Sequence, residues 1–195
     1  MITQRFNINR VWDGVEISNK HNTMFMGFTN LLNDLVDHFK DQTDVGKKMI
    51  EVGAYMGEST FLFACSGLFS EIHTIDPHGG EEEFNDMFGY TWGEVKSEFE
   101  KNTRHFDNII HWDKYSYEVD DKFSNREFDF LYIDAEHTYE SVKKDLELYT
   151  PKVKRGGIIG GHDYTDNWAG VRQAVDEAFG SPDIKYDDGS WIKYI

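Results

Sequence analysis

Apolar residues recur along this chain with two different spacings. Between residues 24 and 39 they return every three or four positions, which predicts an amphipathic helix. The short apolar runs 48–52 and 71–76 are instead typical of buried strands. Between these two runs, Ser59 is a suitable N-cap for a helix that extends to Leu68. The first part of the chain is therefore expected to alternate helix and strand.

The alternation continues to the end of the chain. Strands are predicted at 108–112, 128–133 and 157–161, and helices at 92–102, 138–149 and 170–179. The last two apolar stretches, 184–188 and 190–195, flank Gly189, and Asp-Gly is a hairpin signal, so one of them runs antiparallel. Strands that alternate with helices predict βαβ units. We therefore expect an α/β fold, a Rossmann-like three-layer sandwich whose seven-stranded, mostly parallel sheet ends in a C-terminal antiparallel hairpin.

The composition is that of a globular protein, and the charge limits its partners. Apolar residues make up 39% and aromatic residues 15% of the chain, which is enough to build a core. The 36 acidic residues outnumber the 20 basic ones, for a net charge of −16, and such a surface repels the phosphates of nucleic acids. The basic clusters Lys47-Lys48, Lys143-Lys144 and 152–155 are interpreted as solvated edges. We expect no nucleic-acid partner.

The chain carries no sign of a membrane segment or of a disulfide framework. Its longest apolar runs are too short to span a bilayer, and the first residues have no apolar signal core. Cys65 is the single cysteine, and its setting in FLFACSG predicts a small buried hydrophobe rather than a nucleophile. These features predict a cytoplasmic protein without a membrane partner.

Charged residues follow several of the predicted strands. Asp76, Asp134 and the pair His162-Asp163 each come after an apolar run. Because the carboxyl ends of parallel strands share one edge of a sheet, these residues should line one crevice together with the turn at Gly53. The sequence thus predicts one ligand site at this edge.

The segment MIEVGAYMGEST, residues 49–60, has the composition of a turn that approaches a nucleotide. Gly53 and Gly57 allow a sharp backbone turn, and the helix that follows offers its N-terminus to a negative group. In the dinucleotide fingerprint G-x-G-x-x-G, the position of the second glycine is occupied here by Tyr55. The sequence therefore supports NAD binding only weakly, and a purely structural tight turn remains an alternative. Asp76 can accept hydrogen bonds from both hydroxyls of a ribose, although an aspartate at a strand end also suits a plain turn. Together, the turn and Asp76 predict an adenosine ligand.

Four stretches give the chain a resemblance to a known family. They are IEVGAYMGEST, IHTIDP, DFLYIDAEHTYESVKKDLELYTPKVKRGGIIGGHDY and the terminal hairpin. Over residues 24–195 the chain resembles the class I S-adenosylmethionine-dependent methyltransferases, and within them the O-methyltransferases of the type 24 and macrocin kind. The resemblance implies S-adenosylmethionine as cofactor and S-adenosylhomocysteine as product. The residues implied for cofactor binding are Glu51, Gly53, Ala54, Tyr55, Gly57, Ser59, Asp76, Ser116 and Asp134, with Asp76 on the ribose and Ser116 near the adenine. Tyr55 and Trp12 are the aromatic candidates for contact with the sulfonium.

Methyl transfer to a hydroxyl needs a base or a metal ion that removes the proton. His137 is the candidate base, because an unperturbed imidazole has a pKa of about 6.5. Asp134 and Asp163 would position either the acceptor or a metal, and Asp134, His162 and Asp163 are candidate ligands of a divalent cation such as Mg²⁺, although histidine is a poorer Mg²⁺ ligand than carboxylate. The resemblance implies both roles, but the family commonly carries two acids where this chain has His162-Asp163. The alternatives are that Asp134 caps a helix, that His137 bonds a neighbouring loop and that His162-Asp163 is a plain turn.

We therefore predict a single methyltransferase domain over residues 1–195. It comprises an N-terminal cap segment and helix (1–45), a cofactor-binding core (46–195) and a substrate loop (77–92), with the helix and the loop covering the two sides of the cofactor pocket. The resemblance implies methylation of a small-molecule hydroxyl, on a sugar or a natural-product-like acceptor. The alternatives are a module that binds the cofactor without methyl transfer, a nicotinamide-dependent oxidoreductase and a metal-dependent hydroxylase-like relative. The acceptor and the oligomeric state do not follow from the sequence.

Overall fold

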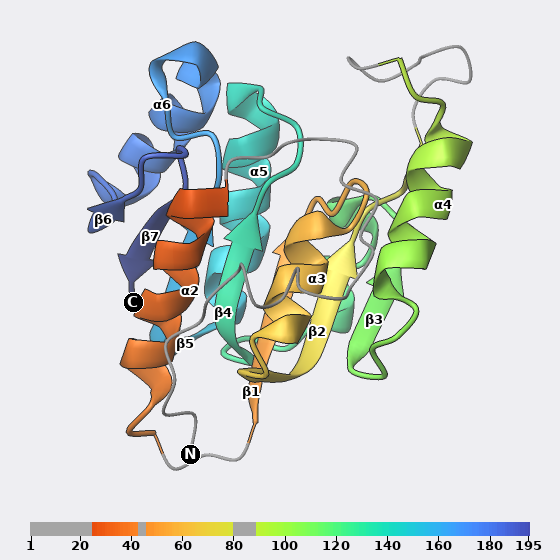
Figure 1. The fold of residues 1–195 in the computed structure, drawn as a ribbon. Helices are drawn as coiled ribbons and strands as arrows, with labels where there is room; N and C mark the ends of the chain where they lie inside the picture. Colours follow the sequence, from red (N-terminus) through yellow and green to blue (C-terminus); the bar gives the residue numbers. More distant parts are fainter. Residues whose placement is uncertain (1–24, 43–45, 80–88) are drawn as a thin grey trace.

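The computed structural model describes residues 25–42, 46–79 and 89–195 (Figure 1). At its centre, seven strands form one sheet in the order β3-β2-β1-β4-β5-β7-β6. The strands are β1 (Lys47–Val52), β2 (Phe69–Ile75), β3 (Ile109–Trp112), β4 (Phe128–Ile133), β5 (Val153–Gly161), β6 (Ile184–Lys185) and β7 (Trp191–Tyr194). Strands β1 to β5 are parallel, and β7 runs antiparallel to both β5 and β6. The predicted α/β sheet with its terminal hairpin is confirmed.

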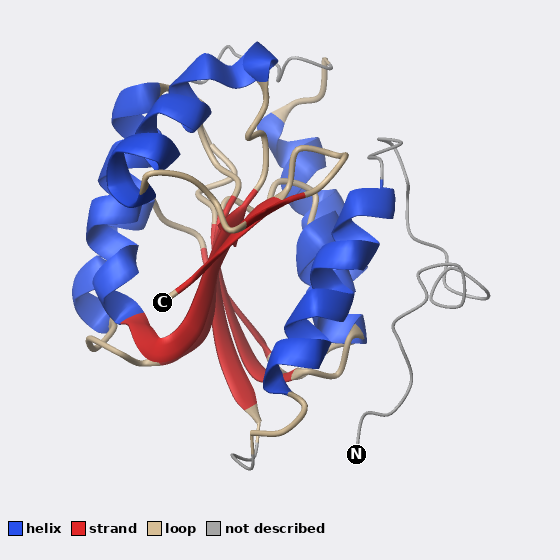
Figure 2. Cartoon of the chain, turned by 90° about the vertical axis from the view of Figure 1, so that its left-hand side faces the viewer, coloured by secondary structure: helices blue, strands red, loops and turns tan. Residues whose placement is uncertain are grey.

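Two layers of helices enclose the sheet, which Figure 2 shows edge-on. The helices are α2 (Phe25–Phe39), α3 (Glu58–Cys65), α4 (Trp92–Thr103), α5 (Tyr139–Tyr149) and α6 (Ala169–Phe179), and short 3₁₀ helices lie at η1 (Ser116–Glu118), η2 (Asp120–Lys122), η3 (Thr150–Lys152) and η4 (Asp166–Trp168). Phe130 and Leu131 are successive residues of β4 and point to opposite faces. Phe130 belongs to the same hydrophobic cluster as Leu31 of α2 and Phe63 of α3, whereas Leu131 belongs to a second cluster with Leu146 of α5. The hydrophobic core thus consists of two clusters, one on each face of the sheet, and the fully buried strand β4 lies between them.

The predicted N-cap role of Ser59 is wrong. The N-cap is two residues earlier, at Gly57 in the left-handed region (φ +78°), so helix α3 begins at Glu58, and no side chain caps it. The Ser59 hydroxyl instead donates a hydrogen bond to the Glu51 carboxylate, at 2.6 Å. A glycine takes up this conformation without steric cost, and Ser59 then lies inside the first turn of the helix, where its hydroxyl reaches Glu51.

Other predictions differ at element ends or fall on parts of the chain that the structure does not describe. Helix α3 ends at Cys65 rather than at residue 68, and β5 begins at Val153 rather than at residue 157. Trp12 of the predicted cap segment and most of the predicted substrate loop lie outside the described residues. The described part of the loop is limited to its two ends.

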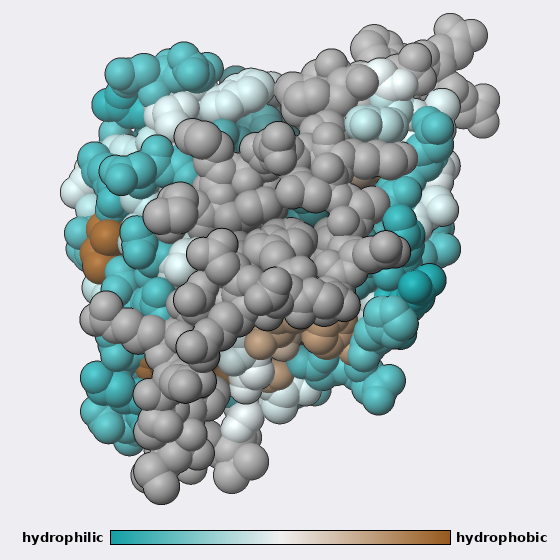
Figure 3. Space-filling model, viewed as in Figure 1, coloured by the Kyte–Doolittle hydropathy of each residue, from teal (hydrophilic) through white to brown (hydrophobic). Residues whose placement is uncertain are grey.

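The described surface is largely hydrophilic on the face seen in Figure 3, which agrees with a net charge of −16. Within residues 25–42, 46–79 and 89–195, none of the helices has both the length and the apolar character that crossing a membrane requires.

Burial raises the pKa of the Cys65 thiol to about 11, so this cysteine stays protonated and is a poor nucleophile.

Candidate active site

The predicted site residues do meet at one edge of the sheet. The backbone N–H of Gly53, after β1, donates to Ile75 of β2 at 2.9 Å, and the N–H of Asp134, after β4, donates to Val52 of β1 at 2.8 Å. The N–H of His162, after β5, donates to the last residue of β4 at 3.2 Å. These bonds continue the ladder of the parallel strands by one residue. They therefore hold the turns after β1, β4 and β5 side by side.

Gly53 is required where the first turn meets the fourth strand. Its φ is +90°, and a Cβ at this position would lie 2.1 Å from the backbone oxygen of Asp134 and 2.7 Å from the Cα of Ala135. Both contacts are with backbone atoms, which cannot rotate away. The glycine therefore lets the predicted cofactor turn pack directly on the strand end that carries Asp134.

Asp76 has a role that the sequence did not predict, because its carboxylate supports this turn. One oxygen accepts the backbone N–H groups of Ala54 (2.9 Å) and Tyr55 (2.7 Å), and the other accepts the N–H of His78 (2.8 Å). Tyr55 is in the left-handed region with φ +47°, a conformation that costs an ordinary residue about 1–3 kcal/mol. A carboxylate has about four acceptor positions, so Asp76 retains capacity for a ribose hydroxyl.

Two histidines to which the sequence pattern assigns no role also support the turn. The buried ring of His78 lies with Nε2 at 2.7 Å from the carbonyl oxygen of Tyr55. His111 Nε2 lies 3.1 Å from the carbonyl oxygen of Asp76. The two rings are 4.9 Å apart and both pack against Phe99. No spacing in the sequence connects these residues, so only the folded chain reveals the contact.

Glu51 lies beneath the turn and is fully buried. Its carboxylate accepts hydrogen bonds from the hydroxyls of Ser59 (2.6 Å), Thr60 (2.5 Å) and Thr74 (3.0 Å). The first turn of α3 is thereby fixed to β1 and β2. Burial raises the pKa of Glu51 to about 7, even though the three hydroxyls favour its charged form. Glu51 therefore supports the turn from below, and its place in a cofactor loop stays a prediction.

Replacing Glu51 by glutamine is expected to change how stability depends on pH. An unfolded glutamate titrates near 4.5 and the folded one near 7, so the folded chain binds the proton more tightly. The free energy of unfolding should fall as pH rises between these values, by up to about 3 kcal/mol. Glutamine cannot ionise, and its amide can accept from Thr60 and Thr74 and donate to Ser59. The variant should therefore gain stability relative to the parent between about pH 5 and pH 8.

Urea unfolding of both proteins across this pH range measures the difference directly. The matched control is Glu147→Gln, because Glu147 is exposed and its substitution should leave the pH dependence of the parent unchanged. Parallel stability curves for the parent and Glu51→Gln would contradict the assignment of a proton to Glu51.

The residues predicted for catalysis form one cluster after β4 and β5. His137 Nε2 lies 2.8 Å from a carboxylate oxygen of Asp163 and 3.8 Å from one of Asp134. His162 Nδ1 lies 3.3 Å from the other oxygen of Asp163. Asp163 is in the left-handed region, with φ +59°, which aspartate tolerates better than most residues. All four side chains are half-buried, and the ring of Trp168 lies 4.3 Å from that of His137.

The carboxylates change the protonation of both histidines. Burial opposes a charge on His137, but Asp134 and Asp163 outweigh it and raise the pKa of His137 to about 9. The same balance, with Asp163 as the main partner, raises the pKa of His162 to about 9. Burial also opposes the Asp163 anion, yet the two histidines hold the pKa of Asp163 well below its usual range. The pKa of His137 thus lies above the value of about 6.5 that an unperturbed imidazole has.

The alternative that Asp134 caps the next helix is also wrong. Thr138 is the N-cap of α5, and its hydroxyl oxygen accepts the N–H of Ser141 at 3.3 Å. Glu136 is exposed and accepts hydrogen bonds from the hydroxyls of Thr138 and Ser141. Asp134 points instead to the cluster with His137.

Three of these residues bring metal-binding atoms together. One ligand atom each from Asp134, His162 and Asp163 lies within 4.8 Å of the other two. Ligands of one cation at about 2.1 Å lie roughly 3–4 Å apart, so small side-chain rotations would close the set around an ion. The donor chemistry fits a divalent cation, and the imidazole favours transition metals over Mg²⁺.

Ser116, predicted near an adenine, lies in η1 just after β3. Its hydroxyl donates to the buried Asp145 at 2.5 Å, and its carbonyl oxygen accepts the hydroxyl of Tyr149 at 2.6 Å. Burial raises the pKa of Asp145 to about 6. The Ser116 side chain thus fastens η1 to α5, and its contact with an adenine stays a prediction.

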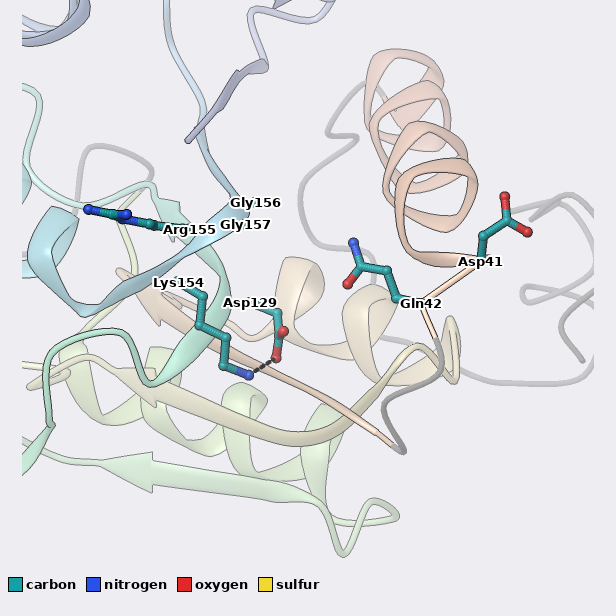
Figure 4. Close-up of a pocket in the computed structure, with 7 residues that line it drawn as sticks. All are labelled: Asp41, Gln42, Asp129, Lys154, Arg155, Gly156 and Gly157. Atoms are coloured by element: carbon teal, nitrogen blue, oxygen red, sulfur yellow. Dashed lines mark hydrogen bonds and ion pairs between the residues drawn. The ribbon is translucent and has the colours of Figure 1, made fainter.

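A separate cavity of 370 Å³ lies at the opposite edge of the sheet (Figure 4). It is lined by residues near the start of β4 and β5 and after α2, among them Asp129 and Lys154, which form an ion pair at 2.9 Å. None of the predicted catalytic or cofactor residues lines it. The candidate active site therefore remains the group of predicted residues at the carboxyl ends of the strands.

Comparisons with known proteins place most of these residues in one sequence family. A family model described as a methyltransferase domain matches residues 50–164, a range that includes the predicted site residues from Glu51 to Asp163. The uncharacterized protein R132 of Acanthamoeba polyphaga mimivirus is 31% identical over 124 residues, which cover 60% of this chain and 51% of that protein. The chain thus spans about half the length of this curated relative.

Solved structures share the fold at low sequence identity. CalS11, a TDP-rhamnose 3'-O-methyltransferase of calicheamicin biosynthesis, has a TM-score of 0.55 at 16% identity and covers 85% of this chain and 79% of its own. A putative caffeoyl-CoA O-methyltransferase from Staphylococcus aureus has a TM-score of 0.57 at 20% identity, with 84% and 80% covered. Cofactor-bound Rv0187 from MTB has a TM-score of 0.58 at 14% identity, with 92% and 83% covered. At these identities the similarity establishes the fold alone.

Proposed function

The chain belongs to the family of methyltransferase domains whose model it matches, and on this basis we propose that it is an S-adenosylmethionine-dependent methyltransferase that acts on a hydroxyl group of a small molecule. The observation that carries the proposal is the packing of the glycine turn on the strand end that bears the acid-histidine cluster. Gly53 lies against the backbone of Asp134 and Ala135. A ligand held by the turn would therefore lie next to the groups that could activate an acceptor.

The cofactor would supply a methyl group on a positively charged sulfur. The left-handed turn of residues 53–57 and the first N–H groups of α3 suit its carboxylate, with Ala54, Tyr55, Gly57 and Ser59 as the nearest residues. Asp76, already fixed by three N–H groups, would accept a ribose hydroxyl. Ser116 would border the adenine from η1.

The cluster after β4 and β5 would prepare the acceptor. His137 would take the proton of the acceptor hydroxyl at Nδ1, and Asp163, 2.8 Å from Nε2, would orient the ring and stabilise the imidazolium that forms. Before that step the ring must be neutral, with its remaining proton on Nε2, whereas Asp134 and Asp163 favour the charged ring and raise the pKa of His137 to about 9. Trp168 packs on the His137 ring and would form one wall of the acceptor site. A sugar is the first acceptor class to test, because CalS11, which shares the fold, is described as a rhamnose O-methyltransferase.

Thermal unfolding with S-adenosylmethionine, S-adenosylhomocysteine or NADH tests the proposed cofactor. At a hundredfold excess over its dissociation constant, a ligand adds about 2.7 kcal/mol to stability, which is a shift of roughly 5–10 °C for a domain of this size. Both adenosyl ligands should produce this shift. In Asp76→Ala the ligand-induced shift should be lost, whereas Asp107→Ala, at an exposed position, should retain it.

Because Asp76 also supports the turn, the unliganded melting temperature of each variant is the reference for its own shift. A shift with NADH alone, or with none of the three ligands, would reject the methyltransferase proposal. A shift with the adenosyl ligands but no turnover of any hydroxyl acceptor would instead favour a binding module.

A further inference from the structure

The cluster of Asp134, His162 and Asp163 is an unusual donor set for Mg²⁺. Its three ligand atoms lie within 4.8 Å of one another and come from the ends of two adjacent strands. Mg²⁺ binds almost only oxygen ligands and keeps several waters. An imidazole nitrogen among the ligands shifts the preference toward first-row transition metals.

The charges around the cluster also favour a cation. Within residues 25–42, 46–79 and 89–195, no lysine or arginine forms an ion pair with Asp134 or Asp163, and their ionic partners are the rings of His137 and His162. The carboxylates are at most 30% exposed, so water compensates their charge only in part. A bound dication would neutralise both carboxylates at once.

We propose that Asp134, His162 and Asp163 bind a divalent transition-metal ion, such as Mn²⁺, Fe²⁺ or Co²⁺, in preference to Mg²⁺. This inference rests on the proposed function, since the ion would lie beside the residues that would activate the acceptor hydroxyl. His162 is the residue that decides the preference, because the two aspartates would serve either class of ion. His137 remains outside the ligand set and keeps its place beside Asp163.

The strand ends hold the three ligands where an ion could join them. The N–H of Asp134 is bonded to β1 and the N–H of His162 to β4, which fixes both backbones. Asp163 follows in the left-handed conformation, and its carboxylate lies 3.3 Å from His162 Nδ1. Only the side-chain torsions remain to be set by the ion.

Isothermal titration of the chelator-treated protein with Mg²⁺, Mn²⁺ and Co²⁺, each alone, tests this proposal without any turnover. Mn²⁺ and Co²⁺ should bind with dissociation constants at least about tenfold lower than that of Mg²⁺. The visible absorption of bound Co²⁺ gives a second readout, because it responds to replacement of a nitrogen ligand by oxygen. Thermal shifts with S-adenosylmethionine are recorded on the same samples.

The variant His162→Asp should weaken Co²⁺ binding about tenfold, leave Mg²⁺ binding equal or stronger, and change the Co²⁺ spectrum. His105→Asp makes the same substitution at an exposed position of the chain and should change none of these values. A third variant, His162→Asn, adds no charge and should also lose the preference for transition-metal ions over Mg²⁺. It controls for a folding defect that the extra carboxylate of His162→Asp could cause.

Equal or tighter binding of Mg²⁺, no binding of any dication, or the same effect from His105→Asp would overturn the inference. If the shift with S-adenosylmethionine persists in that case, the methyltransferase proposal stands and only the metal assignment fails. If the metal preference is found but no adenosyl ligand binds, the proposed function fails and the metal site stands.

Discussion

Replacing His137 by glutamine is expected to lower kcat for methyl transfer by about 10²–10⁴-fold, the usual contribution of a general base. His137 Nε2 lies 2.8 Å from Asp163, at the strand ends where the acceptor would bind. Glutamine preserves a polar side chain of similar length but cannot take a proton from a hydroxyl. Its carbonyl or amide would still reach toward the same carboxylates, so the cluster should stay folded. Single-turnover assays at saturating S-adenosylmethionine measure the loss at the chemical step.

The cofactor-induced thermal shift separates this loss from a defect in binding. His137→Gln should keep the shift of the parent protein, because His137 does not contact the 53–59 turn in the described hydrogen bonds and ion pairs. His105→Gln, at an exposed position away from the cluster, should keep both the shift and kcat. A His137→Gln rate within about threefold of the parent would remove His137 from the proposed mechanism, because a lost base costs far more than that.

The location of the site could be predicted from the sequence because it depends mainly on strand order. The run 128–133 has the apolar pattern of a buried strand and forms one, with all six residues buried. Once the apolar runs are known to be parallel strands, Asp76, Asp134 and His162 must follow them on one edge. This reasoning needs only the spacing of the apolar residues and the rule that short, right-handed connections join parallel strands in α/β folds.

The contacts within the site could not be predicted, because they depend on backbone conformations and on residues far apart in the chain. The turn at Tyr55 reaches its left-handed conformation with the help of Asp76 and His78, which lie more than twenty positions later. The raised pKa of His137 likewise requires the distance to Asp163. A sequence pattern gives the residue types at a strand end but not which of them face one another.

Replacing Gly53 by alanine is expected to destabilise the fold strongly. The added Cβ would lie 2.1 Å from the backbone oxygen of Asp134, in a residue with φ +90°. Overpacking against rigid backbone and a disfavoured φ each cost about 1–3 kcal/mol, so the free energy of unfolding should fall by about 3–5 kcal/mol. Denaturant unfolding, followed by circular dichroism, measures this change.

Gly67→Ala is the matched control, because Gly67 has φ +64° but no heavy atom within 4 Å of the position of its Cβ. Gly67→Ala should lower the free energy of unfolding by about 1–2 kcal/mol, the cost of a positive φ alone. The difference between the two variants therefore measures the steric contact of the turn with Asp134. Equal losses would show that the turn can move away from β4. Unequal losses, accompanied by loss of the S-adenosylmethionine shift in Gly53→Ala alone, would mean that the cofactor turn and the catalytic strand end form one rigid unit. In that case the position of the methyl donor relative to His137 would be set by the backbone, before any side chain contacts the acceptor.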